Sequence, residues 1–376
     1  MTTVTRRRLL RTATGAAALG LLPSATQAAP QKGGDDFAFF LLGDLHLDKL
    51  DHHDRSWLMA EKPGDLRQIE NYSRITREVV PSLLAELKQH AASDPRIAFT
   101  THIGDFVEGL AGTPDLAARQ ARESIALVSA HGPAKPFLFC KGNHDITGPG
   151  AETAWNDILM PYVAGQASVA AVDRSCFTVR HGSDTLFAYY DAYKPESLDW
   201  LEVALAKRTE KRLFVVIHPP VVPYSARSDW HLFAKPAEAA LRERLLNLLG
   251  KNRAIVLCGH LHKYGTVVRE TPTGRFVQVA TLSVIPRAGV TPKDRREGVA
   301  SYGPGVVTLE PEFSPKTRES RKQLLAAEAP YVRHFEYADA TGYGIVSVKG
   351  EAVMLDLYTG LGKRKWRTLD LSALIA

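Results

Sequence analysis

The stretch Phe37-Ala-Phe-Phe-Leu-Leu42, followed directly by Gly43-Asp44-Leu45-His46, gives the clearest indication of how this chain folds. A short, continuous apolar run is typical of a strand buried on both faces of a sheet. A loop with a carboxylate and an imidazole begins where this run ends. The same order recurs along the chain, where apolar runs at 96–100, 136–140, 213–217 and 254–258 precede Gly104-Asp105, Gly142-Asn143-His144-Asp145, His218 and Gly259-His260-Leu261-His262.

Segments with helical spacing separate these expected strands. Their apolar residues recur three or four positions apart, at Ile75, Val79, Leu83 and Leu87, and at Leu241, Leu245, Leu248 and Leu249 before Gly250. Alternating strands and helices predict an α/β fold. Ligands of such sheets bind just beyond the carboxyl ends of the strands, so the polar clusters should meet there. The glycines at 43, 104, 142 and 259 mark turns where the backbone must pass close to a metal or phosphate.

The residue types in these clusters suit a centre of two metal ions that hydrolyses phosphate esters. A phosphate ester carries negative charge and resists attack by hydroxide. Two dications neutralise that charge and lower the pKa of a bound water. Imidazole, carboxylate and amide ligands, with one carboxylate oxygen shared, can hold such ions ~3.5–4 Å apart. These ligands accept manganese, iron, zinc or cobalt, so the sequence leaves the metals open.

The ordered set D-x-H, G-D, G-N-H-D, isolated H and G-H-x-H resembles the calcineurin-like metallophosphoesterase superfamily, over about residues 37 to 285. The resemblance implies a sandwich of two mixed β-sheets flanked by helices. It also implies ligands for a first metal at Asp44, His46 and His262, ligands for a second at Asn143, His218 and His260, and a bridge between them at Asp105. His144 is then catalytic, because it orients the phosphate and protonates the leaving oxygen. A neighbouring carboxylate, Asp145 or Asp48, would tune its pKa.

Position 108 departs from one branch of this superfamily. Purple acid phosphatases carry a tyrosine three residues after the bridging aspartate, and its phenolate makes an iron(III) centre. The corresponding residue here is Glu108. We therefore expect the ordinary class, with two divalent or mixed-valence metals, outside the purple acid phosphatase branch.

The N-terminus has the pattern of a twin-arginine export signal. Arg6, Arg7 and Arg8 precede a small apolar run at 13–22, and small residues continue to Ala28. The run is too short for a membrane-spanning helix, which needs ~20 apolar residues. We therefore expect cleavage near Ala28, recognition by the twin-arginine export machinery, a periplasmic or secreted location, and no transmembrane segment after cleavage.

The charge balance bears on possible binding partners, and the cysteine content bears on disulfide formation. The chain has 47 basic and 41 acidic residues, and residues 1–28 hold four arginines and no acidic residue. Without residues 1–28 the formal net charge is therefore 43 − 41 = +2. This balance gives no support for a nucleic-acid partner. A basic segment from Arg287 to Lys322 could be a solvated face or a rim that steers anionic substrate. Cys140, Cys176 and Cys258 are expected to be buried free thiols.

We expect one catalytic domain over residues 36–376, after a signal peptide at 1–28. The stretch from about 286 to 340 carries several prolines and little periodicity, which predicts an irregular insertion with one helix near 318–328. Residues 342–358 predict a β-hairpin that closes the second sheet. The insertion would then loop out of a continuous fold.

The predicted activity is hydrolysis of phosphate monoesters or diesters by in-line attack of a metal-bridging hydroxide, in an exported enzyme. One alternative is a phosphodiesterase acting on nucleotides or phospholipid headgroups. An alternative of another class is a non-catalytic metal-binding protein, since fold does not fix function. Aromatic side chains in the expected pocket loops could stack on a base or anchor their own loops, namely Trp57, Trp155, Tyr224 and Trp230.

Overall fold

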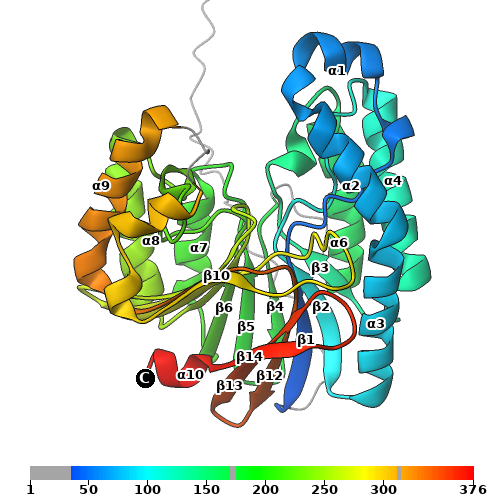
Figure 1. Ribbon diagram of the computed structural model, residues 1–376. Helices are drawn as coiled ribbons and strands as arrows, with labels where there is room; N and C mark the ends of the chain where they lie inside the picture. The colour runs from blue at the N-terminus through cyan, green and yellow to red at the C-terminus, as the bar shows by residue number, and fades with distance from the viewer. Residues whose placement is uncertain (1–34, 170–174, 311–314) are drawn as a thin grey trace, which may run out of the picture.

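A computed structural model describes residues 35–169, 175–310 and 315–376 of the chain. Two mixed β-sheets form a sandwich with helices on its outer faces (Figure 1). The first sheet contains, in spatial order, β14 (Lys365–Asp370), β13 (Ala352–Thr359), β12 (Gly342–Lys349), β1 (Phe37–Leu42), β2 (Ile97–His102) and β3 (Phe137–Phe139). The second contains β10 (Lys293–Glu297), β11 (Val332–Asp339), β8 (Tyr264–Thr271), β9 (Gly274–Ala280), β7 (Ile255–Cys258), β6 (Arg212–Val216), β5 (Thr185–Tyr189) and β4 (Phe177–His181). The predicted α/β sandwich is confirmed.

The helices form two groups, one beside each sheet (Figure 1). Beside the first sheet lie α1 (Arg55–Glu61), α2 (Leu66–Glu78), α3 (Val80–Ser93), α4 (Pro114–His131), α5 (Ala151–Ala154) and α6 (Met160–Ala167). Beside the second lie α7 (Ser197–Ala206), α8 (Ala239–Lys251) and α9 (Arg318–Glu328), and the short α10 (Leu371–Leu374) follows β14. No helix within the described residues is long and apolar enough to cross a membrane.

Strand β6 shows why the predicted strands are apolar at every position. Its side chains alternate between two cores, because successive residues of a strand point to opposite faces of the sheet. Phe214 and Val216 belong to the core between the sheets. Leu213 and Val215 belong to the core under α7 and α8. A strand covered on both faces must be apolar throughout, as the sequence indicated.

Aromatic rings join the two sheets at the centre of the sandwich. Phe39 of β1 stacks on Phe99 of β2, with ring centroids 5.2 Å apart. Phe187 of β5 stacks on Phe214 of β6 at 4.7 Å. The pairs meet edge to face, since Phe39 and Phe187 lie 5.2 Å apart at an interplanar angle of 85°. Edge-to-face packing of this kind is favoured by the ring quadrupoles and fixes one sheet against the other.

The helical spacing from Ile75 to Leu87 belongs to two helices, where the sequence suggested one. Helix α2 ends at Glu78 and α3 begins at Val80, with Pro81 in its first turn. A proline inside a helix removes one hydrogen bond and its ring clashes with the carbonyl four residues before it. The chain therefore breaks at Val79 and starts a new helix, in whose first turn proline is tolerated.

The expectation of an irregular insertion at 286–340 is wrong in part. The expected helix is present as α9, with the predicted bounds. Strand β11, however, pairs with β8 on one side and with β10 on the other, so it is part of the second sheet. Antiparallel pairing there buries Phe335 and Tyr337. Apolar residues at every second position are typical of a strand, and this pattern was overlooked in the sequence.

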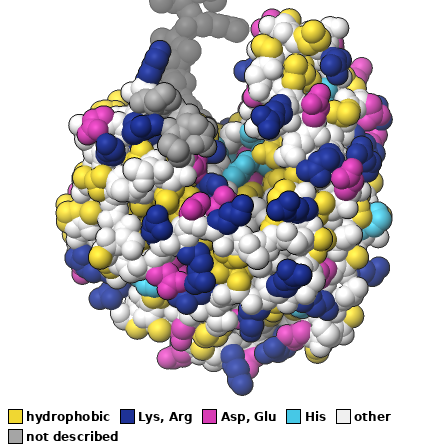
Figure 2. Space-filling view, viewed as in Figure 1, with side chains coloured by type: hydrophobic (Ala, Val, Ile, Leu, Met, Phe, Trp, Pro, Cys, Tyr) yellow, Lys and Arg dark blue, Asp and Glu magenta, His cyan; other side chains and the backbone are white. Residues whose placement is uncertain are grey.

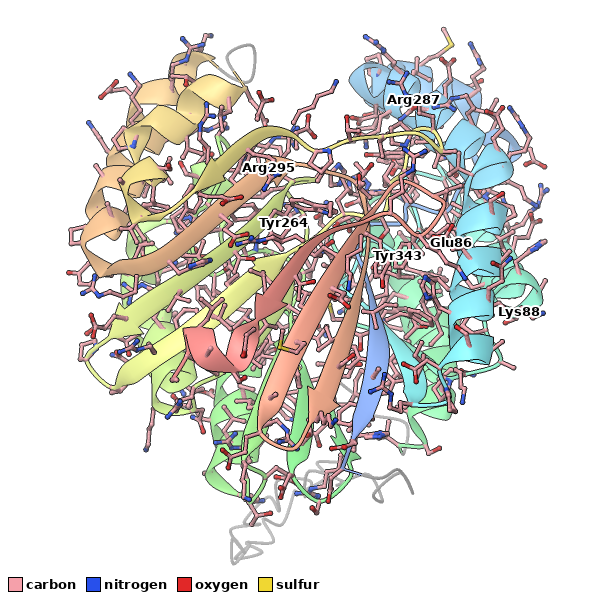
Figure 3. The ribbon with its side chains drawn as sticks, turned by 60° about the horizontal axis from the view of Figure 1, so that its bottom comes forward. Glu86, Lys88, Tyr264, Arg287, Arg295 and Tyr343 are labelled. Atoms are coloured by element: carbon pink, nitrogen blue, oxygen red, sulfur yellow. The ribbon has the colours of Figure 1, made fainter. Side chains whose placement is uncertain are left out.

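The predicted hairpin at 342–358 is confirmed as β12 and β13. It was expected in the second sheet but belongs to the first. Strand β12 pairs antiparallel with β1, so the hairpin extends the first sheet. Tyr343 of β12 donates its hydroxyl to Glu86 of α3 at 2.6 Å, a contact seen in Figure 3. Glu86 also accepts from the backbone of Gly362 and Lys363 in the β13–β14 turn. The pairing partner of a hairpin depends on which strand lies free beside it, and the hairpin sequence does not show that.

Candidate metal centre

The loops after β1, β2, β3, β6 and β7 bring the predicted site residues together. Within the described part of the chain, three groups of side chains place ligand atoms within 4.8 Å of one another: Asp44, His46, Asp105 and His262; His46, Glu108 and His144; and Asp105, His218 and His260. Figure 2 shows histidine at the base of the notch between the two groups of helices. The polar clusters therefore meet at the carboxyl ends of the strands, as the sequence predicted.

The first candidate metal position lies between two imidazoles and a carboxylate. The Nε2 atoms of His46 and His262 are 3.0 Å apart, and Asp44 Oδ1 is 3.6 Å from His262 Nε2. His46 Nδ1 donates to Glu108 Oε2 at 2.7 Å, which leaves the lone pair of Nε2 facing His262. A metal ion could take the place of the proton shared between these two nitrogens, with Asp44 as a further ligand, so this geometry fits a metal.

The second candidate position is built around His218. Its Nδ1 donates to the carbonyl of Ile103 at 2.8 Å, so Nε2 faces the centre. Nε2 lies 3.0 Å from Asp105 Oδ2 and 3.2 Å from Asn143 Oδ1. The ring of His260 is 5.0 Å from that of His218. An amide oxygen, a carboxylate and two imidazoles are a donor set that divalent transition metals accept.

Asp105 lies between the two positions. Its Oδ2 is 3.0 Å from His218 Nε2 and 3.7 Å from His46 Nε2. Its Oδ1 accepts from the backbone N–H of His144 at 2.8 Å, which fixes the orientation of the carboxylate. One carboxylate oxygen thus faces both groups of ligands. This is the placement that a bridging ligand requires.

Protonation within the cluster also fits bound cations. Asp44 is fully buried and its Oδ2 has no hydrogen-bond partner among the described residues. Burial raises the pKa of Asp44 to about 8, although His218 lowers it. Burial lowers the pKa of His260 to about 3 and that of His262 well below its usual range, so both imidazoles are neutral, the form that binds metals. At His218, burial is outweighed by the charges of Asp105 and Asp44, which raise its pKa to about 9. Asp44 Oδ2, buried without a partner among the described residues, is placed to bind a cation.

The backbone of the ligand loops has an uncommon conformation. Positive φ angles occur at Asp44 (50°), His46 (45°), Asp105 (54°), His260 (72°) and His262 (54°). Residues other than glycine pay a free-energy cost there, although Asp and His tolerate it better than most. Such strain tends to collect at functional sites, where the surrounding fold imposes it. Here it turns each side chain from the end of its strand toward the shared centre.

Two of the motif glycines permit the closest contacts. A Cβ atom on Gly142 would lie 2.1 Å from the backbone nitrogen of Asp105 and 2.2 Å from its Oδ1. A Cβ atom on Gly259 would lie 2.2 Å from Asp44 Oδ2. The sequence predicted close approach of the backbone to a metal or phosphate at these turns. The close neighbour at both turns is a candidate carboxylate ligand from another loop, Asp105 at Gly142 and Asp44 at Gly259.

His144 lies beside the ligands and is partly open to solvent. Its Nδ1 is 2.8 Å from the carbonyl oxygen of Glu108 and 3.4 Å from Glu108 Oε2. Burial lowers the pKa of His144, but the charges of Glu108 and Asp105 outweigh this and raise it above its usual value. With Nδ1 bound to the Glu108 carbonyl, Nε2 is the nitrogen that can serve a substrate.

The carboxylate expected to tune His144 was assigned wrongly. Asp145 accepts from the backbone N–H groups of Val107 and Gly142, so it holds two loops together. Asp48 binds the side chains of His53, Ser73 and Gln120. Glu108 is the carboxylate that faces His144. Asp145 and Asp48 lie one and two residues from His144 and His46 in the sequence. Contacts with Ser73 of α2 and Gln120 of α4 turn Asp48 away from the centre.

Sequence reasoning missed three residues around the centre. Glu108 ends one of the candidate metal-binding stretches, residues 104–108, and stands where purple acid phosphatases carry tyrosine, but its role was not predicted: it is buried and orients His46. Gln68 of α2 donates to Glu108 Oε1 at 2.8 Å. One turn later, the ring of Tyr72 stacks on His46 at 4.4 Å, with its hydroxyl 3.4 Å from His262 Nδ1. The i, i+4 spacing of Gln68 and Tyr72 on a helix with a buried face was the available signal.

Comparison with known proteins identifies the family. The family model described as calcineurin-like phosphoesterase matches residues 37–264, which include the loops that carry the candidate ligands. The chain belongs to this family. The match confirms the resemblance noted in the sequence, and it makes this phosphoesterase a metal-dependent hydrolase of phosphate esters. A search among curated proteins gives no match to the chain.

Solved structures show the same fold at low identity. A purple acid phosphatase from yellow lupin (Lupinus luteus) seeds is 12% identical, with a TM-score of 0.52; the alignment covers 93% of this phosphoesterase and 56% of the lupin chain. A dimetal phosphatase from Danio rerio is 11% identical, with a TM-score of 0.51 and coverage of 89% and 99%. The chain thus spans little more than half of the lupin protein. At these identities the likeness establishes the fold.

The aromatic side chains considered for substrate binding have different positions in the phosphoesterase. Trp155 and Tyr224 are fully buried and donate to Ser175 and to the carbonyl of Lys263, so a stacking role for them is wrong. Trp57 packs against a small core at α1 and α2. Trp230 is 38% exposed, and its ring lies 5.6 Å from that of His260. It is the member of this set that lies at the centre.

The basic segment from Arg287 to Lys322 is not one surface. Arg287 and Arg295 are exposed and lie well apart (Figure 3). Arg295 donates to Glu297 at 2.6 Å and lies 5.7 Å above the ring of Trp366. Arg321 is 2% exposed, with its Nε 2.6 Å from Asp229 Oδ1. Burial of Arg321 excludes it from both alternatives, the solvated face and the steering rim.

Proposed function

We propose that this phosphoesterase hydrolyses phosphate monoesters or diesters by in-line attack of an activated water. The observation that carries the proposal is the position of Asp105, whose Oδ2 faces His218 and His46 from opposite groups of ligands. Membership of the family supports the reaction class. The assignment of each ligand follows from the contacts around the two positions.

We propose Asp44, His46 and His262 as ligands at the first position, Asn143, His218 and His260 as ligands at the second, and Asp105 as the bridge. Two divalent or mixed-valence ions bound there would neutralise phosphate charge and acidify water. Glu108 holds His46 in the tautomer that can bind.

His144 is the proposed general acid. The Glu108 carbonyl binds Nδ1 and the adjacent carboxylate favours the protonated ring, so Nε2 can carry a proton to the leaving oxygen. The fixed ring orientation keeps that proton at one atom. The backbone N–H of His144 also orients Asp105, so a single loop positions both the proposed acid and the proposed bridge.

A substrate and metal panel tests the proposal. Protein stripped of metal and reloaded separately with manganese, iron, zinc or cobalt is assayed on 4-nitrophenyl phosphate and bis(4-nitrophenyl) phosphate. We expect activity to require metal, to saturate at two ions per chain and to favour one ester class. Full activity in stripped protein, or saturation at one ion, would contradict the proposed centre.

A nucleotide or headgroup phosphodiesterase is the second candidate, and Trp230 is the observation that favours it. Its partly exposed ring beside His260 places an aromatic surface at the centre, where a base could stack. In that case Trp230→Leu should raise the KM for a nucleotide ester and leave the KM for an alkyl phosphate ester unchanged. An equal change in KM for both esters would argue against a nucleotide substrate.

We also propose export by the twin-arginine route to the periplasm or the medium. Residues 1–34, which carry the signal pattern, lie outside the described residues. The support is the sequence Arg6-Arg7-Arg8 before a short apolar run and small residues up to Ala28. Export of folded protein by this route would allow metal to bind before the chain leaves the cytoplasm.

A further inference from the structure

Helix α2 places two side chains, one turn apart, against the first candidate metal position. Gln68 donates to Glu108 Oε1 at 2.8 Å, and Glu108 Oε2 accepts from His46 Nδ1. The ring of Tyr72 stacks on that of His46, with a centroid distance of 4.4 Å and an interplanar angle of 16°. The Tyr72 hydroxyl is 3.4 Å from His262 Nδ1. Both histidines of this position are therefore in contact with α2, directly or through Glu108.

The second candidate position is held in another way. His218 Nδ1 donates to the backbone carbonyl of Ile103 at 2.8 Å. The ring of His260 lies 5.0 Å from that of His218 and 5.6 Å from that of Trp230. Among the described residues, neither His218 nor His260 makes a hydrogen bond, ion pair or ring contact with α2 (Leu66–Glu78). The side chains of α2 thus act on one of the two positions.

Helix α2 is fixed to the loop that carries His46. The hydroxyl of Ser73 donates to Asp48 Oδ2 at 2.7 Å, and the hydroxyl oxygen of Thr76 accepts from the backbone N–H of Asp48 at 3.0 Å. Asp48 is two residues after His46. Tyr72 itself is 6% exposed and packs in the main hydrophobic core. A side chain locked by packing on a fixed helix holds its polar group at one place, as support of a metal ligand requires.

The tautomer of His262 gives the Tyr72 hydroxyl a defined role. A histidine that binds metal through one ring nitrogen normally donates its other N–H to an acceptor, and this fixes the tautomer and the ring orientation. His262 Nε2 faces His46 Nε2 at 3.0 Å, so Nδ1 carries the proton and the Tyr72 oxygen is placed to accept it. The acceptor is a carboxylate at His46 and a backbone carbonyl at His218. Tyr72 supplies the corresponding acceptor for His262.

We propose that Tyr72 is a positioning residue for the first metal position, where it orients His262 through its hydroxyl and His46 through its ring. The inference rests on the proposed metal ligands, and it adds a helix whose contacts distinguish the two ions. Loss of such a partner typically lowers metal affinity 10- to 100-fold. The hydroxyl contact of 3.4 Å is long for a hydrogen bond, so we expect a loss of about ten-fold, at the lower end of this range.

Calorimetric titration of the metal-stripped full chain with manganese tests the effect on each ion. Tyr72→Phe keeps the ring and removes the hydroxyl, and it should weaken one binding event about ten-fold and leave the other unchanged. Tyr72→Leu also removes the stacking on His46 and should weaken the same event further. Tyr189→Phe is the matched control, because it removes a buried hydroxyl that lies 2.9 Å from Thr101 Oγ1 in the core. It should bind both ions as the unchanged protein does.

A ligand variant shows at which position the hydroxyl acts. His260→Ala removes a proposed ligand of the second position, so the tighter event that remains belongs to the first. Adding Tyr72→Phe to His260→Ala should still weaken this remaining event about ten-fold, because effects at sites without shared contacts are additive. Loss of the Tyr72→Phe effect in this background would place the hydroxyl at the second position and overturn the proposal.

Turnover provides a second readout that separates positioning from chemistry. On 4-nitrophenyl phosphate, Tyr72→Phe should need about ten-fold more manganese for its half-maximal rate and should reach the kcat of the unchanged protein at saturating manganese. A lower kcat at saturation would place the hydroxyl on the substrate. A visible band of the iron-loaded protein that Tyr72→Phe abolishes would make Tyr72 itself a ligand. Either result would overturn the positioning role, as would manganese affinities equal to those of Tyr189→Phe or an equal loss at both ions. Fewer than two bound ions in the unchanged protein would instead contradict the proposed centre on which this inference rests.

Discussion

Replacing Glu108 with glutamine tests the link between a buried carboxylate and two histidines. Glu108 Oε2 accepts from His46 Nδ1 at 2.7 Å and lies 3.4 Å from His144 Nδ1. Glutamine keeps the size and the hydrogen-bonding oxygen but removes the charge. The substitution should therefore act on the metal affinity of His46 and on the pKa of His144, with little change in packing.

The size of each effect follows from these contacts. Loss of a carboxylate that orients a ligating histidine typically lowers metal affinity about 10- to 100-fold. At 3.4 Å, Coulomb's law gives a Glu108–His144 attraction of about 1 kcal/mol at the dielectric constant of water and about 5 kcal/mol at an effective dielectric constant of about 20. Because one pKa unit corresponds to about 1.4 kcal/mol, the pKa of His144 should fall by roughly 1 to 3 units.

The sign of the pH effect follows from the proposed role of His144 as general acid. The negative charge of Glu108 raises the pKa of His144, so its removal lowers that pKa. A general acid works only when protonated, and activity is lost as the pH rises through its pKa. The alkaline limb of the pH–rate profile should therefore move to lower pH in Glu108→Gln.

The assay is a pH–rate profile on an alkyl phosphate ester at saturating metal, together with a metal titration of the stripped protein. Glu61→Gln serves as the control, because Glu61 is exposed on α1 and distant in sequence from the centre. An alkaline limb and a metal affinity that both match the control would refute the reasoning. If the metal affinity changes but the alkaline limb of the pH–rate profile does not, Glu108 orients His46 but does not influence proton transfer by His144.

Four further predictions follow from the centre and the N-terminus. Asp105→Asn should lose at least one metal and most activity, because an amide cannot supply a shared anionic oxygen; two tightly held metals with normal turnover would contradict the bridge. His144→Asn should keep both metals and lose ~10²–10⁴-fold in turnover on esters with poor leaving groups, and far less on aryl esters, as paired rate and metal measurements would show. Metal-loaded protein should be colourless or weakly coloured and most active at neutral to alkaline pH, since burial and the charge of Glu108 hold the pKa of Tyr72 well above its usual value and disfavour a phenolate; a strong visible band would disprove this. Arg6→Lys with Arg7→Lys should leave folded enzyme in the cytoplasm on fractionation, and an unchanged exported yield would favour general secretion.

Local sequence patterns predicted much of the fold. The strands β1, β2, β3, β6 and β7 were recognisable because both faces of each are covered, which makes every position apolar. The hairpin β12–β13 and helix α9 followed from alternation and helical spacing. Strand β11 was missed because its neighbours carry prolines and charges, and its alternation is visible only over its inner residues. The order of the strands within each sheet could not be predicted from local patterns, because the hydrogen bonds between β1 and β12 join residues about 300 positions apart.

The candidate ligands were predictable for a different reason. Each follows a recognisable strand, and parallel strands bring their carboxyl ends to one edge. The motif order then resembled a known family, and the family match confirms that resemblance. Their side chains could therefore be named before any contact was known. Their assignment to two positions rested on the resemblance, and the contacts of Asp105 with His46 and His218 now support it.

The residues around the ligands depended on tertiary structure. Glu108 faces His144 because the loop after β2 folds across the loop after β3, while Asp145, one residue from His144, is turned to Val107 and Gly142. Sequence distance is a poor guide to such contacts.

Residue types, motif order and local periodicity were enough to predict the reaction class, most of the buried strands and the side chains available to bind metal. Only the packed structure shows which carboxylate faces which histidine and which aromatic ring remains at the centre. These are relations between segments far apart in the chain, and they are set by the packing of one sheet on the other.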